Sequence, residues 1–356
     1  MREQLLATEQ VKAIEWRDGA LHLLDQRDLP GQQRWLSCER LEQVLDALRD
    51  GVVLGAPLSA VCLAYGLVLA LRERVAQGAG WGEAWLQDWQ MLVADQPADG
   101  SWSWVLKLMR ERLERSGPQQ APVLELEAEA AAIHCSLLEG WQSMARSGLR
   151  LLRRHQLGEQ CLLTHGHASV LAGGGGPLAV LAAAYDDGLL EQVYLEQPQA
   201  GSAASRLTAW QLAELAIPQS HYSAAACAQL MKVGSITWVI VGAQRIAANG
   251  DLLNTVGTYQ LAVNAMHHGV RLMVVAPSTV IDLSLEQGDD AALEDLLEPA
   301  LSADVTEALA AEAGRFAPQL DVTPADFIDF LVTEKGVVER PDAEKIAQLL
   351  CRKRLH

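Results

Sequence analysis

The feature that most constrains the fold is a change in pattern after residue 155, where short apolar runs begin to alternate with helical stretches. The apolar runs, which we predict to be strands, cover residues 160–164, 192–195, 238–242 and 271–277, and the helical stretches cover 178–185, 208–215 and 259–267. Strands separated by helices of this length form βαβ units around a parallel sheet. Because ligands bind beyond the carboxyl ends of such strands, we expect a site in the residues that follow them.

The first 155 residues have a different pattern. Residues 11–26 form two short apolar runs around Asp18-Gly19, which predicts a β-hairpin. From 38 to 74, broken at Gly51 and Gly55, and again from 86 to 113, the apolar residues recur at helical spacing, with a loop at 96–104. Residues 124–155 are suited to one long helix. We therefore predict an α/β fold: a mainly helical domain with a small β element (1–120), a connecting long helix (121–155) and a Rossmann-like parallel-sheet domain (156–356).

Charge and cysteine usage exclude several classes of protein. The chain of 356 residues has 28 Lys and Arg against 45 Asp and Glu, a net charge of −17 that disfavours binding to nucleic acid. No apolar run reaches the about 18 to 20 residues needed to span a membrane, and no leader segment is indicated, so we expect a cytoplasmic protein. The six cysteines are scattered without metal-ligand spacing. We expect mostly buried, reduced thiols and neither a metal nor another cofactor.

Three loops carry the candidate site residues. The first, at 164–177, contains His165, Gly166 and His167 before a run of four glycines. Glycines there let backbone amides approach a phosphate, or simply form a flexible turn, and histidines without a neighbouring carboxylate in sequence are more often structural. The second loop, at 242–259, is the most site-like; the third is the turn at 54–57. The polar residues of the second loop are Arg245, Asn249, Asp251 and Asn254.

Several phrases of the sequence together resemble the methylthioribose-1-phosphate isomerase family, which is related to the alpha, beta and delta subunits of translation initiation factor 2B. The resemblance is collinear from about residue 11 to about 338. The phrases are Ile14-Glu-Trp, Leu24-Asp-Gln, Gly55-Ala-Pro, Ala64-Tyr-Gly, Leu163-Thr-His, Arg206-Leu-Thr-Ala-Trp, Val239-Ile-Val-Gly-Ala, Arg245-Ile-Ala-Ala-Asn-Gly-Asp, Gly257-Thr-Tyr, Asp321-Val-Thr-Pro and Thr333-Glu-Lys-Gly.

The resemblance implies an aldose-to-ketose isomerisation in methionine salvage, for which the family uses a cysteine, an aspartate and phosphate-binding arginines. This chain departs from the family at each of these positions: Gly166 stands for the cysteine, Gln244 for the aspartate, and Leu54 and Gln96 for arginines. Glycine and glutamine carry no titrating group for general acid or base catalysis. Further departures lie at Glu196-Gln-Pro-Gln-Ala, His221-Tyr-Ser and Asn254-Thr255, whereas the scaffold phrases remain.

Two functional hypotheses follow. The first is a homodimeric, non-catalytic binding or regulatory homologue whose pocket takes a small sugar or sugar phosphate. The second is an active aldose-ketose isomerase that uses other residues, such as His165 or His167 paired with Asp251, with Arg245 or Arg206 as replacement cations. Cys161 and Cys227 are more simply core thiols. The remaining pocket candidates are Leu54, Gly55, Ala56, Gln96, Asn254 and Thr255. The acidic segment 282–304 is either a docking site for a basic partner or, as we favour, a solvated face.

Overall fold

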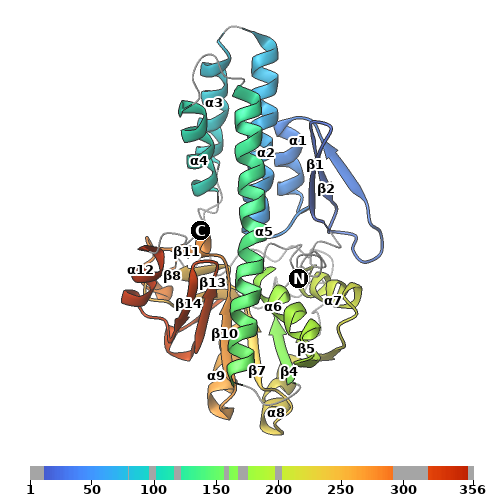
Figure 1. The fold of residues 1–356 in the computed structure, drawn as a ribbon, viewed down its shortest axis with the longest axis vertical. Helices are drawn as coiled ribbons and strands as arrows, with labels where there is room; N and C mark the ends of the chain where they lie inside the picture. The colour runs from blue at the N-terminus through green and yellow to red at the C-terminus, as the bar shows by residue number, and fades with distance from the viewer. Residues whose placement is uncertain are drawn as a thin grey trace, which may run out of the picture. The chain divides into compact units, whose positions relative to one another are not determined.

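The structure is a computed structural model that describes residues 12–78, 80–95, 102–115, 122–155, 160–166, 175–196, 203–291 and 320–351 (Figure 1). The chain divides into two compact units. The first contains Met1–Gln142, and the second contains Ser143–Ser169 and Gly174–His356. The predicted long helix is confirmed as α5 (Pro122–His155), and because the division falls between residues 142 and 143, this helix contributes to both units.

The first unit opens with a three-stranded sheet of order β1-β2-β3, formed by β1 (Ile14–Arg17), β2 (Ala20–Leu24) and β3 (Trp35–Cys38). The predicted hairpin is confirmed, with Asp18 and Gly19 at φ of 54° and 73° in the turn. Positive φ at both central residues gives a turn whose twist matches that of the strands. Strand β3 was not predicted, because its four residues are too few to show a clear apolar alternation in the sequence.

The rest of the first unit is helical, as predicted. Gly51 and Gly55 separate α1 from α2, and Leu58–Leu71 of α2 is buried almost throughout, because α1, α3 and α4 all pack against it. A helix that is apolar on every side is stable only in such a position. The helices preceding α5 are α1 (Leu41–Arg49), α2 (Ala56–Gln77), α3 (Trp81–Ala94) and α4 (Ser103–Arg115).

A seven-stranded sheet, of order β14-β13-β10-β7-β4-β5-β6, organises the second unit. Every neighbouring pair is parallel except β13 and β14, so the predicted Rossmann-like sheet is confirmed and gains an antiparallel edge strand. Its strands are β4 (Gln160–His165), β5 (Leu190–Glu196), β6 (Gln219–Tyr222), β7 (Trp238–Val241), β10 (Arg271–Val275), β13 (Phe330–Thr333) and β14 (Gly336–Glu339).

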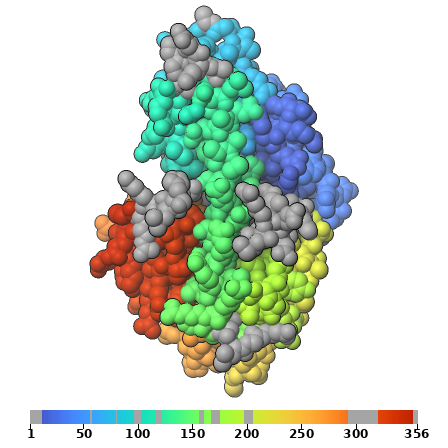
Figure 2. All heavy atoms as spheres, viewed as in Figure 1, coloured from blue at the N-terminus to red at the C-terminus, as the bar shows by residue number. Residues whose placement is uncertain are grey.

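Helices connect the strands of this sheet. The face that carries Leu163, Val239, Val241 and Val274 packs against the apolar side of α9, which includes Leu261 and Ala265. Near the C-terminus, α12 presents exposed side chains at the surface of the unit (red in Figure 2). The helices of this unit after α5 are α6 (Gly175–Asp186), α7 (Ala203–Glu214), α8 (Cys227–Lys232), α9 (Thr258–His268) and α12 (Ala343–Cys351).

A second, four-stranded sheet of order β11-β8-β9-β12 was missed by the sequence analysis. Much of the polar loop predicted at 242–259 belongs to it. Its strands have two to four residues and include Arg, Asn and Asp, so no apolar alternation marks them, and β9 pairs with a strand distant in sequence. The strands are β8 (Arg245–Ala247), β9 (Leu252–Thr255), β11 (Ile281–Asp282) and β12 (Leu320–Thr323), and the 3₁₀ turns are η2 (Ala224–Ala226), η3 (Ser278–Val280), η4 (Gly288–Asp290) and η5 (Ala325–Phe327).

The thiols are less uniformly buried than predicted. Cys38, Cys62 and Cys227 are buried and Cys161 is half-buried, but Cys135 and Cys351 are exposed, on α5 and α12. These two lie on the outward faces of amphipathic helices, which the scattered spacing of the cysteines does not reveal. Among the described residues no helix is long and apolar enough to cross a membrane.

Candidate functional site

Three polar residues form a row at the carboxyl edge of the main sheet. His165, Glu196 and Tyr222 are the last residues of β4, β5 and β6. Glu196 is the register partner of Tyr222, and Thr164 is the partner of Leu195, so His165 and Glu196 come next to each other at the strand ends. Residues in register on neighbouring strands project from the same face of a sheet. The row therefore places an imidazole, a carboxyl and a phenol side by side at the expected position for a ligand.

His165, on β4, is the first member of this row, and Glu196 lies between it and Tyr222. Its side chain is buried, its Nδ1 contacts Oε2 of Glu196, and its Nε2 lies 3.0 Å from the carbonyl oxygen of Val256. Burial lowers the pKa of His165, but the Glu196 carboxylate and the Val256 carbonyl outweigh burial and raise this pKa above its ordinary value. The partner suggested for this histidine from the sequence was Asp251; the carboxylate beside His165 is instead Glu196, which comes from the neighbouring strand and not from the same loop.

Gly166 follows His165 directly and has no room for a side chain. Its φ is +67°, and a Cβ built on it would lie 2.8 Å from Oγ1 and 3.1 Å from Cβ of Thr255. Side chains at positive φ are strained, and carbon and oxygen atoms do not pack this closely. Thr255, at the end of β9, therefore occupies the place where any side chain at position 166 would begin.

The connection from β9 to α9 contacts His165 through Val256 and Gly257 and is held in place by hydrogen bonds. The Nδ2 of buried Asn254 donates to Oγ1 of Thr258 (3.1 Å), and this hydroxyl donates to the carbonyl of Thr255 (2.7 Å). Asp321 accepts hydrogen bonds from the backbone N–H groups of Gly257 (2.7 Å) and Tyr259 (3.0 Å). Burial raises the pKa of Asp321 above its ordinary value, although the two N–H donors act to lower it. Asn254 thus braces the start of α9.

The polar residues of the β8–β9 turn also have structural partners. Asp251 accepts hydrogen bonds from the backbone N–H groups of Gly288 (3.0 Å) and Ala325 (2.9 Å) and from Nδ2 of Asn249 (2.8 Å). Its carboxylate therefore joins the turn to η4 and η5. These hydrogen bonds, and not a pairing with a histidine, explain why a carboxylate is present at this position. The polar residues that made this segment look like a site hold the second sheet in place.

Gln244 and the two candidate cations lie elsewhere in the second unit. Gln244 is exposed, and its backbone N–H donates to the carbonyl of Leu253 (3.1 Å). Arg245 is half-buried on β8, with its Nε 3.3 Å from Oδ2 of Asp282, and Arg206 is half-buried on α7. Arg245 is therefore committed to a carboxylate of the same unit.

The candidate residues of the first unit lie at the start of α2. The backbone N–H of Leu54 donates to Oε1 of the buried Gln26 (3.1 Å), and Gly55, with φ of 92°, precedes Ala56, the first residue of α2. Asp95, next to Gln96, is exposed and lies 3.4 Å from Nη2 of Arg49. Gln96 and His167 are outside the described residues.

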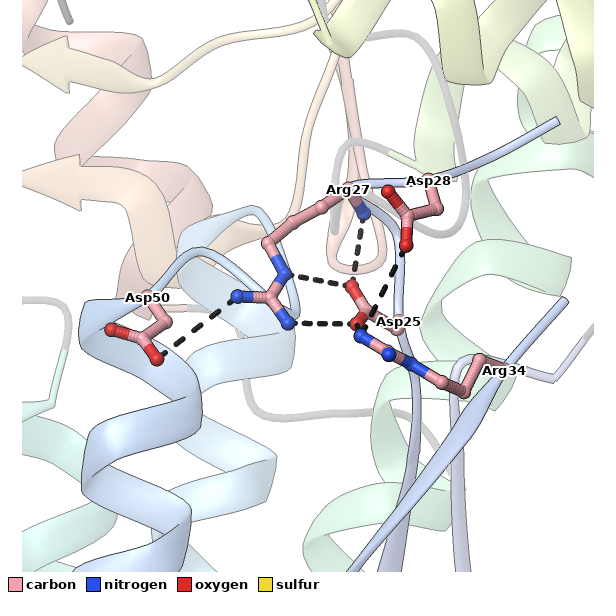
Figure 3. Close-up of polar contacts among 5 residues, drawn as sticks. All are labelled: Asp25, Arg27, Asp28, Arg34 and Asp50. Carbon is pink, nitrogen blue, oxygen red and sulfur yellow. Dashed lines mark hydrogen bonds and ion pairs between the residues drawn. The ribbon is translucent and has the colours of Figure 1, made fainter. Parts of the chain in front are cut away.

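The residue before Gln26 is the centre of an ion-pair cluster that the sequence analysis missed (Figure 3). Asp25 is fully buried and accepts hydrogen bonds from Nε (2.9 Å) and Nη2 (2.7 Å) of Arg27 and from Nη2 of Arg34 (2.7 Å). The hydrogen bonds from Arg27 are the largest of the effects that hold the pKa of Asp25 well below its usual range. The alternation of acidic and basic residues from 25 to 34 was the available signal.

The profile of the initiation factor 2 subunit family matches residues 52–340, which is most of the chain. The chain belongs to this family. Over the full length of both chains it is 52% identical to the methylthioribose-1-phosphate isomerases of Ectopseudomonas mendocina and of Pseudomonas entomophila. Among solved structures it is similar to 5-methylthioribose 1-phosphate isomerase from Pyrococcus horikoshii, with 25% identity, 98% coverage of each chain and a TM-score of 0.81.

The second branch of the initiation factor 2 subunit family is also represented among the similar structures. The subunit delta of translation initiation factor eIF-2B from A. fulgidus is 25% identical, with 95% of this chain and 100% of that chain covered and a TM-score of 0.77. The family named from the sequence phrases is thus confirmed.

Of the described cysteines, Cys227 lies near the row, close to Tyr222 and Glu196, whereas Cys161 does not. Cys161 lies near the amino end of β4, with its Sγ 3.8 Å from Oε2 of Glu191. Cys227 is buried at the start of α8 and accepts a hydrogen bond from Nδ2 of Asn264 (3.3 Å). Burial raises the pKa of both thiols, so both remain protonated and weakly nucleophilic near neutral pH.

Proposed function

We propose that this member of the initiation factor 2 subunit family does not carry out the isomerisation for which its relatives are named. It acts instead as a non-catalytic binding or regulatory protein on the same scaffold. The observation that carries the proposal is the pair Gly166 and Thr255. The position of the family's cysteine has no side chain, and Thr255 fills the space in which one would start.

The other departures support the same function. Opening a sugar ring and moving hydrogen between two carbons requires groups that exchange protons, and an exposed Gln244 amide does not. Leu54 replaces a cation in the first unit, and each charge-assisted hydrogen bond to a phosphate is worth about 1.5 to 3 kcal/mol. Two such losses, at Leu54 and at Gln96, would weaken binding of a phosphate by roughly two to four orders of magnitude.

The second candidate is an active aldose-ketose isomerase. Two observations favour it: relatives about half identical over the full length are named isomerases, and His165 with Glu196 is a buried pair that can hold a proton. In this alternative, the imidazole of His165 takes the role that the family assigns to the cysteine and the aspartate. His165 differs from both because it precedes the cysteine position and is already bonded at both ring nitrogens.

A turnover assay separates the two candidates. The purified chain is incubated with methylthioribose 1-phosphate, and ketose formation is followed by NMR, with the Ectopseudomonas mendocina relative as the positive control. We expect no ketose above the uncatalysed rate even at high protein concentration. Turnover within about a hundredfold of the relative, a barrier difference of about 2.7 kcal/mol, would overturn the proposal. If that turnover disappears in His165→Asn, the second candidate is correct.

We also propose that the chain forms a homodimer. The stripe Tyr259, Val263 and Met266 on α9 supports this proposal, because these side chains are 42%, 40% and 63% exposed and recur at helical spacing on one face. The opposite face of α9 packs into the core through Leu261 and Ala265. An exposed apolar stripe at the spacing of one helix face is typical of a surface that contacts another subunit.

A further inference from the structure

The phenol of Tyr222 is a buried polar group without a partner. Tyr222 is 5% exposed, and its hydroxyl has no hydrogen-bond partner among the described residues. A buried hydroxyl without a hydrogen bond is costly, and natural proteins rarely keep one unless a ligand or a water satisfies it. Burial, followed by the nearby Glu196 and Cys227, raises the pKa of Tyr222, so the hydroxyl keeps its proton and can donate it in a hydrogen bond.

Glu196 lies on the strand next to Tyr222 and supplies a hydrogen-bond acceptor, where the phenol supplies a donor. It is the register partner of Tyr222 on β5, its Oε2 contacts Nδ1 of His165, and 14% of its side-chain surface remains exposed. An ionised carboxylate only accepts hydrogen bonds, and it has more lone pairs than one imidazole can use. The edge of the sheet thus presents a donor and an acceptor side by side, in contact with solvent through the acceptor.

The charge near this edge disfavours an anion. Glu196 contacts the imidazole of His165, and both Glu196 and Asp321 are close enough to act on it by Coulomb effects. Arg245, on β8, is paired with the carboxylate of Asp282. A phosphate brought to the edge would face two carboxyl groups and one imidazole. Two like charges at close range repel strongly where water is excluded.

We propose that Glu196 and Tyr222 bind a neutral polyhydroxy ligand, a free sugar or a polyol, through one hydroxyl that donates to the carboxylate and accepts from the phenol. A hydroxyl is the simplest group that does both at a single atom. The inference rests on the proposed function, since it assigns a ligand class to a site that has lost the family's catalytic and phosphate-binding residues. It goes further by naming the residues that select an uncharged ligand.

Calorimetry and ligand-observed NMR with the full chain test the proposal. The probes are D-ribose and ribitol as neutral ligands, with ribose 5-phosphate and inorganic phosphate as anions. We expect the neutral probes to bind and the phosphorylated sugar to bind at least about tenfold more weakly than ribose, as one uncompensated charge contact predicts. Glu196→Gln, which keeps the shape and removes the charge, should weaken ribose binding by about tenfold.

Tyr222→Phe removes only the hydroxyl and should weaken ribose binding by about threefold to tenfold. The matched control is Tyr185→Phe on α6, which removes a phenol from a half-buried position outside the row and should leave the affinity unchanged. Thermal melting of each variant shows that it is folded. If Glu196→Gln or Tyr222→Phe unfolds, the unsubstituted chain still gives the ligand class. Its binding of ribose and ribitol is then compared, by competition, with its binding of the two anions.

Three outcomes would overturn the inference: tighter binding of ribose 5-phosphate or phosphate than of the neutral probes, no binding of either neutral probe up to about 50 mM, or affinities for ribose that Glu196→Gln and Tyr222→Phe leave unchanged. These outcomes are separate from the turnover assay. Turnover of methylthioribose 1-phosphate contradicts the proposed function, whereas absence of both turnover and neutral-ligand binding contradicts only the inference about the ligand.

Discussion

Gly166 combines a positive φ with a close neighbour, and the two effects can be measured separately. Gly166→Ala adds a Cβ against Thr255 as well as backbone strain, so we expect the free energy of unfolding to fall by roughly 2 to 4 kcal/mol. Gly188→Ala is the matched control, since Gly188 has φ of +70° and nothing within 4 Å of its Cβ position. There we expect a loss of about 1 kcal/mol from strain alone. Urea unfolding measures both, and equal losses would contradict the crowding at position 166.

The contact between His165 and Glu196 predicts a pH-dependent stability. Because the pKa of His165 is raised on folding, its contribution is fully present below the unfolded value of about 6.5 and is lost as the pH rises through the folded value. Glu196→Gln should therefore lower stability more at pH 6 than at pH 9. Urea unfolding at the two pH values tests this, with Glu191→Gln on an exposed position of β5 as the control. The same loss at both pH values would show that the pair does not titrate in this way.

At the scale of one element, the strand connection from β2 to β3 depends on the buried carboxylate of Asp25. Asp25→Asn should lower the free energy of unfolding by roughly 1 to 3 kcal/mol, because Arg27 and Arg34 lose a charged acceptor while staying partly solvated. The pKa of Asp25 is depressed in the folded state, so this loss should shrink as the pH falls below about 4. Asp28→Asn, at a 53% exposed side chain 4.0 Å from Arg34, is the control and should cost little. Comparable losses in the two variants would contradict the assigned role.

The elements that the sequence predicted are those with strong local patterns. The Asp18-Gly19 hairpin, the long helix α5 and the apolar strands β4, β5, β7 and β10 each have a repeat that fits one kind of structure. The second sheet has no such repeat, because its strands are short and β9 depends on pairing with β12, far along the chain. Pairing with distant segments, and not the local sequence pattern, therefore determines that these residues form strands.

The sequence predicted members of the candidate site only where one residue, considered alone, indicates a role. The resemblance located Gly166 and Gln244, and the strand pattern placed His165 at a carboxyl edge. Glu196 as the partner of His165 and Thr255 as the neighbour of Gly166 were not predicted, because both meet their partners only after the sheets have formed. Asn249 and Asp251 were overvalued, since polar residues in a tight turn bind backbone N–H groups as readily as ligands.

At the scale of the whole molecule, the stripe on α9 makes the assembly testable. Met266→Glu places a charge on the most exposed residue of the proposed contact, so we expect the dimer to dissociate with a dissociation constant raised by about tenfold or more. Sedimentation velocity measures the change. Leu124→Glu is the control, because Leu124 is a 66% exposed apolar residue of α5 outside the stripe. A chain that is monomeric before any substitution, or a dimer indifferent to Met266→Glu, would contradict the proposal.

The crowding of Gly166 by Thr255 also limits which substitutions can be accepted at position 166. A lone change from Gly166 to Cys would place its Cβ against the threonine and so reduce stability before it could restore any chemistry. Replacing Thr255 alone would open this space but would add no reactive group at position 166. A side chain at position 166 therefore requires a second change at position 255, so no single substitution introduces one without a loss of stability.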